Sequence, residues 1–135
     1  MSDNPKKRVF LSFIQEDKER ITGLRLLAAN PDYDLEFYDE SLSVPIDSVN
    51  ASYIKARLRE KINRTSITVC LISEQTYASP WVDWELEESD QKGNTIIAMA
   101  IKSVDRATLP KLIKAKGLTF HSWNPEYLNV LIRDA

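Results

Sequence analysis

Two continuous apolar runs constrain the fold of this chain more than any other feature. They are Ile67–Ile72 and Thr95–Ile101, and neither shows the strict alternation of a strand with one face in water. A continuous run of this length suits a strand that is covered on both faces. Such strands occur mainly in parallel sheets flanked by helices, so the two runs predict an α/β fold.

Shorter signals place further strands and helices around these two runs. Strand-forming residues predict strands at Val9–Phe13, Leu35–Tyr38 and Leu118–Phe120. Helices are expected where apolar residues recur at intervals of three or four between capping residues. The expected helices lie after Glu16, after Asn50, from Ser79 to Gly93, from Leu109 to Lys114 with Gly117 closing it, and after Asn124. Strands therefore alternate with helices along the chain.

This alternation predicts a single topology. Five strands that alternate with five helices form a parallel sheet with helices on both faces. Right-handed crossovers restrict it to a flavodoxin-like, doubly wound sheet with the strand order 2-1-3-4-5. Ligands of such sheets bind beyond the carboxyl ends of the strands, where the order reverses. We therefore expect Ser12–Asp17 and Ser73–Glu85 to face each other across one crevice.

The residues at this edge exclude several chemistries. A flavodoxin or Rossmann phosphate site needs a glycine-rich first loop, and none of the three glycines lies there. A phosphate-accepting receiver domain needs aspartates where this chain has Ser12 and Ser73. The only histidine, His121, follows the fifth strand without a nucleophile-elbow motif. With Cys70 as the only cysteine, no zinc-ligand spacing exists, and we expect no metal.

Length and charge suit one cytoplasmic domain over residues 1–135, with a flexible N-terminus over residues 1–7. The formal net charge is -2, and the largest lysine and arginine cluster is Lys6–Arg8. A nucleic-acid partner therefore has no electrostatic support. The N-terminus lacks the apolar core of a signal peptide, and no apolar run approaches membrane-spanning length, so no membrane partner is expected.

The most specific pattern in the chain opens the helix after the third strand. In a helix that begins at Pro80, Trp81 and Glu85 are four residues apart and lie one above the other. The wider pattern combines Phe10-Leu-Ser-Phe13, Tyr38-Asp39, a long loop, and Ser73…Tyr77…Ser79-x-Trp81-x-x-x-Glu85. It resembles the TIR-domain family over nearly the whole chain, although Val82 replaces the family's usual cysteine. The string from Ser79 to Glu85 further resembles the stand-alone TIR-like proteins of bacterial Thoeris antiphage defence systems.

The resemblance implies an enzyme. TIR domains of this kind cleave the bond between nicotinamide and ribose in NAD, and many cyclise the ADP-ribose product. The family's catalytic glutamate maps onto Glu85. Nicotinamide leaves as a neutral molecule, so one carboxylate that stabilises an oxocarbenium-like transition state can be enough. Trp81 would supply an aromatic surface at the mouth of the pocket, where we expect it to be half-buried. NAD is then the substrate, and no separate cofactor is expected.

Other substrate-binding residues follow from the same resemblance. Phe13 matches an aromatic position that borders the nucleotide, and Ser12 beside it would donate a hydrogen bond to the pyrophosphate or ribose. Asp39 opens the Asp39–Asn50 loop, which in the family gates the site and mediates assembly. Ser73 flanks the pocket loop. The expected partners are NAD, further copies through TIR surfaces, and a separate effector protein reached through the nucleotide product.

Three alternatives stay open at this point. Glu85 can be a solvated partner of Lys92 or Arg59, with Trp81 and Trp84 in the core, and for Trp84 we favour the core position. The chain can be an inactive TIR interaction module, although such adaptors often lack the glutamate. The third alternative is an enzyme similar to the nucleoside 2-deoxyribosyltransferases, which use a glutamate on a similar fold and attack the nucleoside covalently.

Overall fold

One sheet organises the part of the protein that the computed structural model describes, which comprises residues 7–14, 17, 33–36, 44–101 and 108–135. Its strands are β1 (Lys7–Ser12), β2 (Tyr33–Glu36), β3 (Ile67–Ile72), β4 (Thr95–Ala100) and β5 (Phe120–His121). All pairs are parallel, and the order is β2-β1-β3-β4-β5. The predicted flavodoxin-like topology is therefore confirmed. The predicted helix after Glu16 and the first residues of the long loop, including Asp39, lie outside the described residues.

The strand boundaries differ from the predicted ones where polar residues take part in pairing. β1 begins at Lys7 because Lys7 and Arg8 pair with Tyr33 and Asp34 of β2. These pairs use backbone groups, which an apolar pattern does not report. For the same reason β2 begins earlier than predicted. β5 begins at Phe120 and extends to His121 through its pairing with Met99, so the prediction that it begins at Leu118 is wrong.

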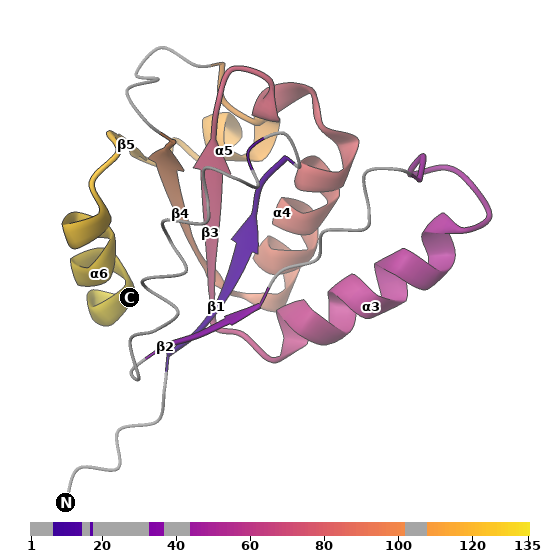
Figure 1. Ribbon diagram of the computed structural model, residues 1–135, viewed down its shortest axis with the longest axis horizontal. Helices are drawn as coiled ribbons and strands as arrows, with labels where there is room; N and C mark the ends of the chain where they lie inside the picture. Colours follow the sequence, from indigo (N-terminus) through magenta and orange to yellow (C-terminus); the bar gives the residue numbers. More distant parts are fainter. Residues whose placement is uncertain (1–6, 15–16, 18–32, 37–43, 102–107) are drawn as a thin grey trace, which may run out of the picture.

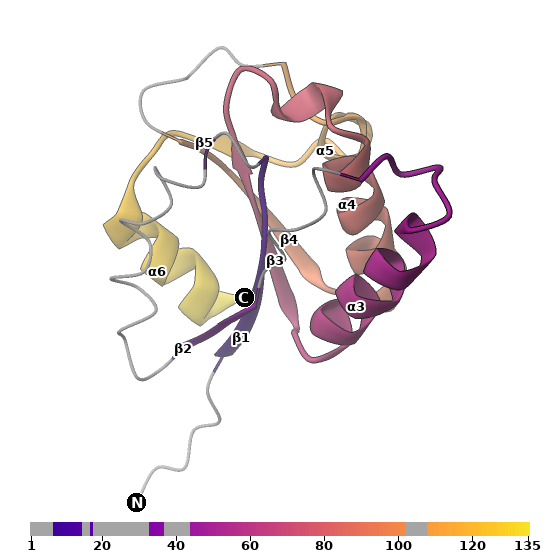
Figure 2. The same ribbon diagram turned by 45° about the vertical axis from the view of Figure 1, so that its right-hand side comes forward.

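The helices cover the sheet on both faces (Figures 1 and 2). They are α3 (Ala51–Asn63), α4 (Pro80–Lys92), α5 (Lys111–Ala115) and α6 (Pro125–Asp134), with a short 3₁₀ turn, η4 (Thr76–Ala78), before α4. In Figure 2 the sheet is seen nearly edge-on, with α6 on one side and α3, α4 and α5 on the other. Every helix in the described part of the chain is too short or too polar to cross a bilayer.

β3 is buried on both faces, as its continuous apolar run predicts. Val69 and Leu71 belong to a cluster that includes Leu128 of α6. Cys70 and Ile72 point the other way, into a cluster whose members from α4 are Val82 and Leu86. The odd and even residues of one strand therefore hold two helical layers together.

The caps of α4 are confirmed, and the cap of α3 is not. The Ser79 side chain accepts a hydrogen bond from the Val82 amide, and Gly93 ends α4 in the left-handed region at φ 96°. Asn50 makes no side-chain cap bond. Its backbone is already helical, at φ -69° and ψ -17°, whereas a side-chain cap requires an extended residue.

Candidate active site

The candidate site lies where β1 ends beneath α4. Along β1, Val9 and Leu11 face α6, so Phe10 and Ser12 face the layer of α3 and α4. The buried side of α4 consists of Trp81, Val82, Glu85, Leu86 and Ser89. Glu85 is the only carboxylate on this side, and it is 4% exposed. The hydroxyl of Ser12, which is fully buried, donates a hydrogen bond of 2.7 Å to Glu85 Oε1.

Two opposing effects act on the Glu85 carboxyl. Removal from water disfavours the charged form, and the hydrogen bond from Ser12 favours it. Burial dominates and raises the pKa of Glu85 from 4.5 to about 8. A buried carboxyl with a strongly raised pKa is typical of functional sites, because ordinary folding favours an apolar residue at such a position.

A second buried hydrogen bond joins the segment that follows β1 to the segment that follows β3. Ser73, which follows β3, donates to Asp17 Oδ2 at 2.6 Å, and its backbone N–H donates to Thr76 Oγ1 at 2.8 Å. Asp17 is 2% exposed. The segments that begin at Ser12 and Ser73 are therefore adjacent, as the topology predicted. No role at the site was predicted for the Asp17 side chain, although the predicted strand order already placed its segment opposite Ser73.

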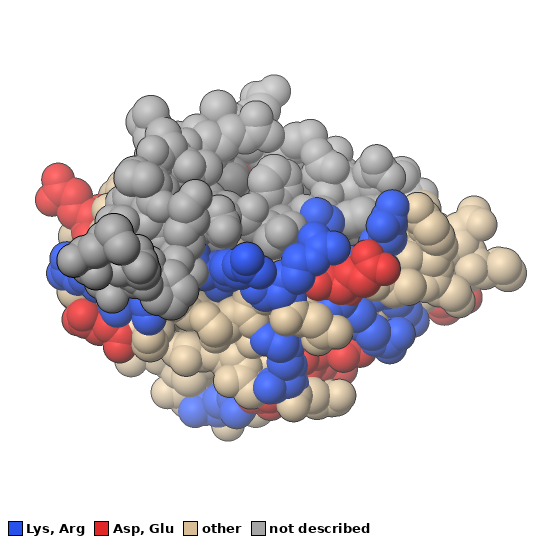
Figure 3. Space-filling model, turned by 90° about the horizontal axis from the view of Figure 1, so that it is seen from below, with Lys and Arg blue, Asp and Glu red and all other residues tan. Residues whose placement is uncertain are grey.

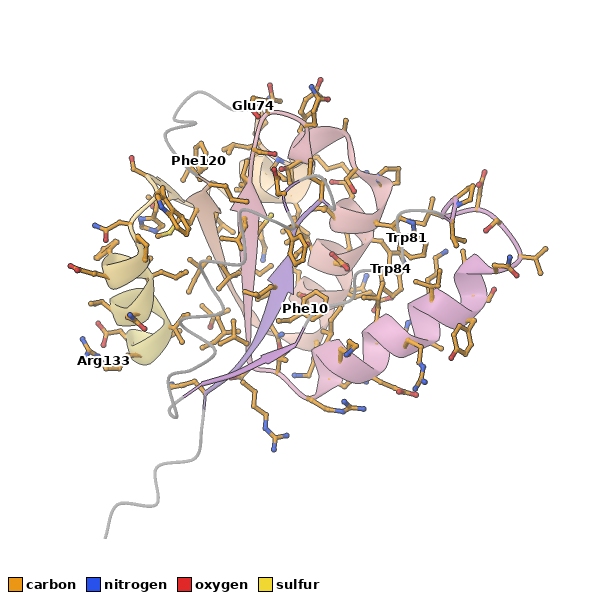
Figure 4. The ribbon with its side chains drawn as sticks, viewed as in Figure 1. Phe10, Glu74, Trp81, Trp84, Phe120 and Arg133 are labelled. Carbon is orange, nitrogen blue, oxygen red and sulfur yellow. The ribbon has the colours of Figure 1, made fainter. Side chains whose placement is uncertain are left out.

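Trp81 differs from its predicted position at the mouth of a pocket. It is 5% exposed and belongs to a core cluster with Phe10 and residues of α3. Its indole Nε1–H donates to the backbone carbonyl of Val44 at 2.8 Å, and its ring meets Trp84 edge to face at 6.2 Å. Figure 4 shows both tryptophans between α4 and α3. The expectation that Trp81 is half-buried is wrong, because the Val44 segment closes over it. Contact of this ring with a substrate stays a prediction.

The remaining predicted substrate-binding residues are not all brought together. Phe13 is partly buried and packs against the cluster that includes Leu128 and Ile132 of α6, on the sheet face opposite Glu85. Asp39 lies outside the described residues. Binding roles for Ser12, Phe13, Asp39 and Ser73 therefore stay predictions.

The alternative that Glu85 is a solvated partner of Arg59 or Lys92 is excluded, because Glu85 is buried and both basic side chains bind other groups. Arg59 binds Glu88 at 3.1 Å, and its guanidinium lies 5.1 Å from the centre of the Trp84 ring. Lys92 donates to the Thr65 carbonyl and to Asn94 Oδ1. Trp84 is half-buried and packs at the margin of the core, partly as predicted.

Metal ligation and thiol chemistry receive no support from the described residues. They contain no group of three histidine, cysteine or acidic side chains that could hold a metal ion. Cys70 is fully buried, and burial is the main cause that raises the pKa of its thiol. A neutral, buried thiol of this kind packs as a small apolar side chain.

The described surface mixes charges. Figure 3 shows basic and acidic side chains beside one another on the face seen from below. Glu60 of α3 lies between Arg57 of the same helix and Arg64 just beyond its end, at 3.4 and 3.9 Å. Exposed pairs of this kind contribute little to stability, and they neutralise part of the local charge.

The fold and the buried carboxylate lead first to a class of protein. The structure resembles the crystal structure of the TIR domain of the Toll-related receptor TRR-2 from Hydra magnipapillata, with a TM-score of 0.63. The superposition covers 93% of this chain and 95% of that domain, at 16% sequence identity. At this identity the likeness establishes the fold alone, and the fold is that of a TIR domain.

Two sequence comparisons narrow the class to a family. The profile of the family described as "Thoeris protein ThsB, TIR-like domain" matches residues 10–106. The chain therefore belongs to the ThsB TIR-like family. It is also 31% identical over 107 residues to the protein named "Putative cyclic ADP-D-ribose synthase ThsB1" of Bacillus cereus (strain MSX-D12). That match covers 72% of this chain and 53% of the relative, so the chain spans about half the length of that protein.

Proposed function

We propose that this protein cleaves NAD at the bond between nicotinamide and ribose, with Glu85 as the catalytic residue. The observation that carries the proposal is the Glu85 carboxyl, which is buried between α4 and the end of β1 and accepts a hydrogen bond from Ser12. Membership of the ThsB TIR-like family and the name of the Bacillus cereus relative support the same chemistry. The relative's name supports a cyclic ADP-ribose-type product. The proposal includes that this product is a signal that activates a separate effector in antiphage defence.

The chemistry explains the use of a single carboxylate. When the bond breaks, its electron pair moves to the pyridinium nitrogen, and nicotinamide departs as a neutral molecule without a proton from an acid. The positive charge that develops on the ribose is stabilised by the carboxylate of Glu85. Capture by water gives ADP-ribose and releases a proton, whereas capture by a nucleophilic group of the substrate itself gives a cyclic product.

The ionisation of Glu85 suits this substrate. With its pKa raised to about 8, the carboxyl is mostly neutral at pH 7 in the free protein. NAD brings a positively charged pyridinium ring, and a nearby positive charge favours the carboxylate. Substrate binding would thus create the charge that the transition state requires. Because Glu85 is 4% exposed, neighbouring side chains must also move before a ribose can reach it.

The test is nicotinamide release from NAD by the wild type, by Glu85→Gln and by Glu87→Gln. Glutamine at position 85 keeps the shape of the side chain and removes the charge, so we expect release to fall at least about 100-fold. Glu87 is exposed on the same helix, and Glu87→Gln should match the wild type. The assay is run in lysates with and without phage infection, so that a requirement for activation by a cue of infection is detected. Equal turnover by the wild type and Glu85→Gln under both conditions would refute the proposal.

The surface also favours a second candidate, an interaction module. Val49 is 92% exposed and Tyr53 63% exposed, at the end of the Asp39–Asn50 loop and in the first turn of α3. Contact of these two side chains with another protein would remove apolar surface from water, which is favourable. If the chain is only an interaction module, Val49→Ser should abolish self-association, and neither the wild type nor any variant should cleave NAD.

A further inference from the structure

Ser12 is placed by the strand and not by a loop. It is the last residue of β1, pairs with Cys70 of β3, and is fully buried. Its side chain points to α4 because residues of a strand alternate between the two faces. A side chain fixed in this way has little freedom to turn toward a ligand.

The hydroxyl of Ser12 has one proton, and Glu85 Oε1 already accepts it at 2.7 Å. The same proton cannot also be donated to a pyrophosphate or to a ribose oxygen. Both partners are buried, and a hydrogen bond is stronger where water is excluded, most of all when the carboxyl is charged. The geometry therefore favours a contact within the protein over a contact with substrate.

We propose that Ser12 is a positioning residue, whose hydroxyl fixes the direction of the Glu85 carboxylate and does not bind substrate. Its catalytic consequence depends on the proposed role of Glu85, but the hydrogen bond and its effect on ionisation do not. Donation from Ser12 favours the charged carboxyl and so opposes the effect of burial.

The titratable groups on the elements around Glu85 have other partners or are neutral. Asp17 accepts a hydrogen bond from Ser73, Asp83 lies 4.0 Å from Lys111, and Arg59 binds Glu88. Cys70 of β3 is a buried thiol with a raised pKa, so it carries no charge near neutral pH. Among the described residues, Ser12 is thus the group whose removal should change the ionisation of Glu85 directly.

The test compares Ser12→Ala with the control Ser89→Ala. Ser89 is an equally buried serine on α4, hydrogen-bonded to Thr68, four residues beyond Glu85. The titration midpoint of the Glu85 carboxyl is followed by ¹³C NMR and assigned by its absence in Glu85→Gln. We expect Ser12→Ala to raise the midpoint by about 1 pH unit, because the charged form loses its hydrogen bond. Ser89→Ala should leave it in place, and Ser12→Thr, which retains a hydroxyl, should restore it.

Kinetics supply a second reading with NAD as the substrate. We expect Ser12→Ala to lower kcat at pH 7 about tenfold, to leave KM within about twofold, and to shift the acid limb of the pH profile upward. An unchanged NMR midpoint, or a raised KM with unchanged kcat, would overturn the proposal. The NMR midpoint is measured without NAD. If Ser12→Ala shifts the midpoint but the wild type releases no nicotinamide, the proposed function is refuted and the positioning of Glu85 by Ser12 is not. If Ser12→Ala does not fold, Ser12→Thr provides the test. Because it retains the hydroxyl, its NMR midpoint and its kcat should equal those of the wild type, and a difference in either would overturn the proposal.

Discussion

Two buried polar contacts join α4 to the sheet, and they differ in kind. Glu85 meets Ser12 at the end of β1, whereas Ser89, about 6 Å further along the helix, accepts from Thr68 Oγ1 at 2.7 Å. The second contact belongs to a network in which Asn94 donates to both Thr65 and Thr68. That network satisfies its groups with neutral partners and with Lys92 at its margin. Polar burial alone therefore does not mark a functional site, whereas a buried carboxyl whose charged form is disfavoured does.

The largest expected effect distinguishes the two contacts by pH. Burial raises the pKa of Glu85 to about 8, above its ordinary value of 4.5. Between these values the unfolded chain loses the proton while the folded protein keeps it, so the stability of the wild type falls as pH rises. Glu85→Gln does not ionise and avoids this loss. We expect its unfolding free energy, relative to the wild type, to increase by about 4 kcal/mol from pH 4.5 to pH 8.

Urea unfolding at several pH values measures this difference. Ser89→Ala serves as the control, because its difference from the wild type should be constant over the same range. A constant difference for Glu85→Gln as well would mean that the folded protein accommodates the charge without cost. The distinction between the two contacts would then be lost.

The neutral network should respond to mutation in stability alone. Asn94→Ala removes two donors to Thr65 and Thr68 and one acceptor for Lys92. Since these groups are buried or partly buried, we expect a loss of about 2 kcal/mol that is independent of pH between 5 and 9. Nicotinamide release at a temperature where the variant is folded should not change. Asn63→Ala, at an exposed position of α3, should cost less than about 0.5 kcal/mol. A changed rate in Asn94→Ala would show that the two contacts are coupled.

The fold was predictable because its signals are local. The apolar runs of β3 and β4, the Ser79 cap and Gly93 each act through neighbouring residues, and together they determine the strand order. The prediction that the Asn50 side chain caps α3 was wrong because of the preceding turn. The turn from Pro45 to Ala51 brings the backbone into helical conformation before Asn50, which the residue type does not reveal.

The candidate site was less predictable because its contacts are distant in sequence. A spacing of four residues placed Trp81 and Glu85 on one side of α4, but it did not show what lies opposite each of them. Opposite Trp81 is the carbonyl of Val44, and opposite Glu85 is Ser12. Only the folded structure shows that the first contact buries the indole and that the second uses the single proton of the serine.

The smallest expected effects concern the two ends of α4. Ser79→Ala removes the side-chain acceptor for the Val82 amide. Gly93→Ala adds a Cβ that meets no atom within 4 Å, but the residue is held at φ 96°, which a side chain disfavours. Each should cost about 1 kcal/mol in thermal or urea unfolding, the first through a lost cap and the second through backbone strain. Ser79→Ala loosens the turn that precedes Glu85, so nicotinamide release should also fall several-fold, whereas Gly93→Ala should retain the rate of the wild type. Equal rates in the two variants would mean that Glu85 is held by Ser12 and by the packing of α4, independently of how the helix begins.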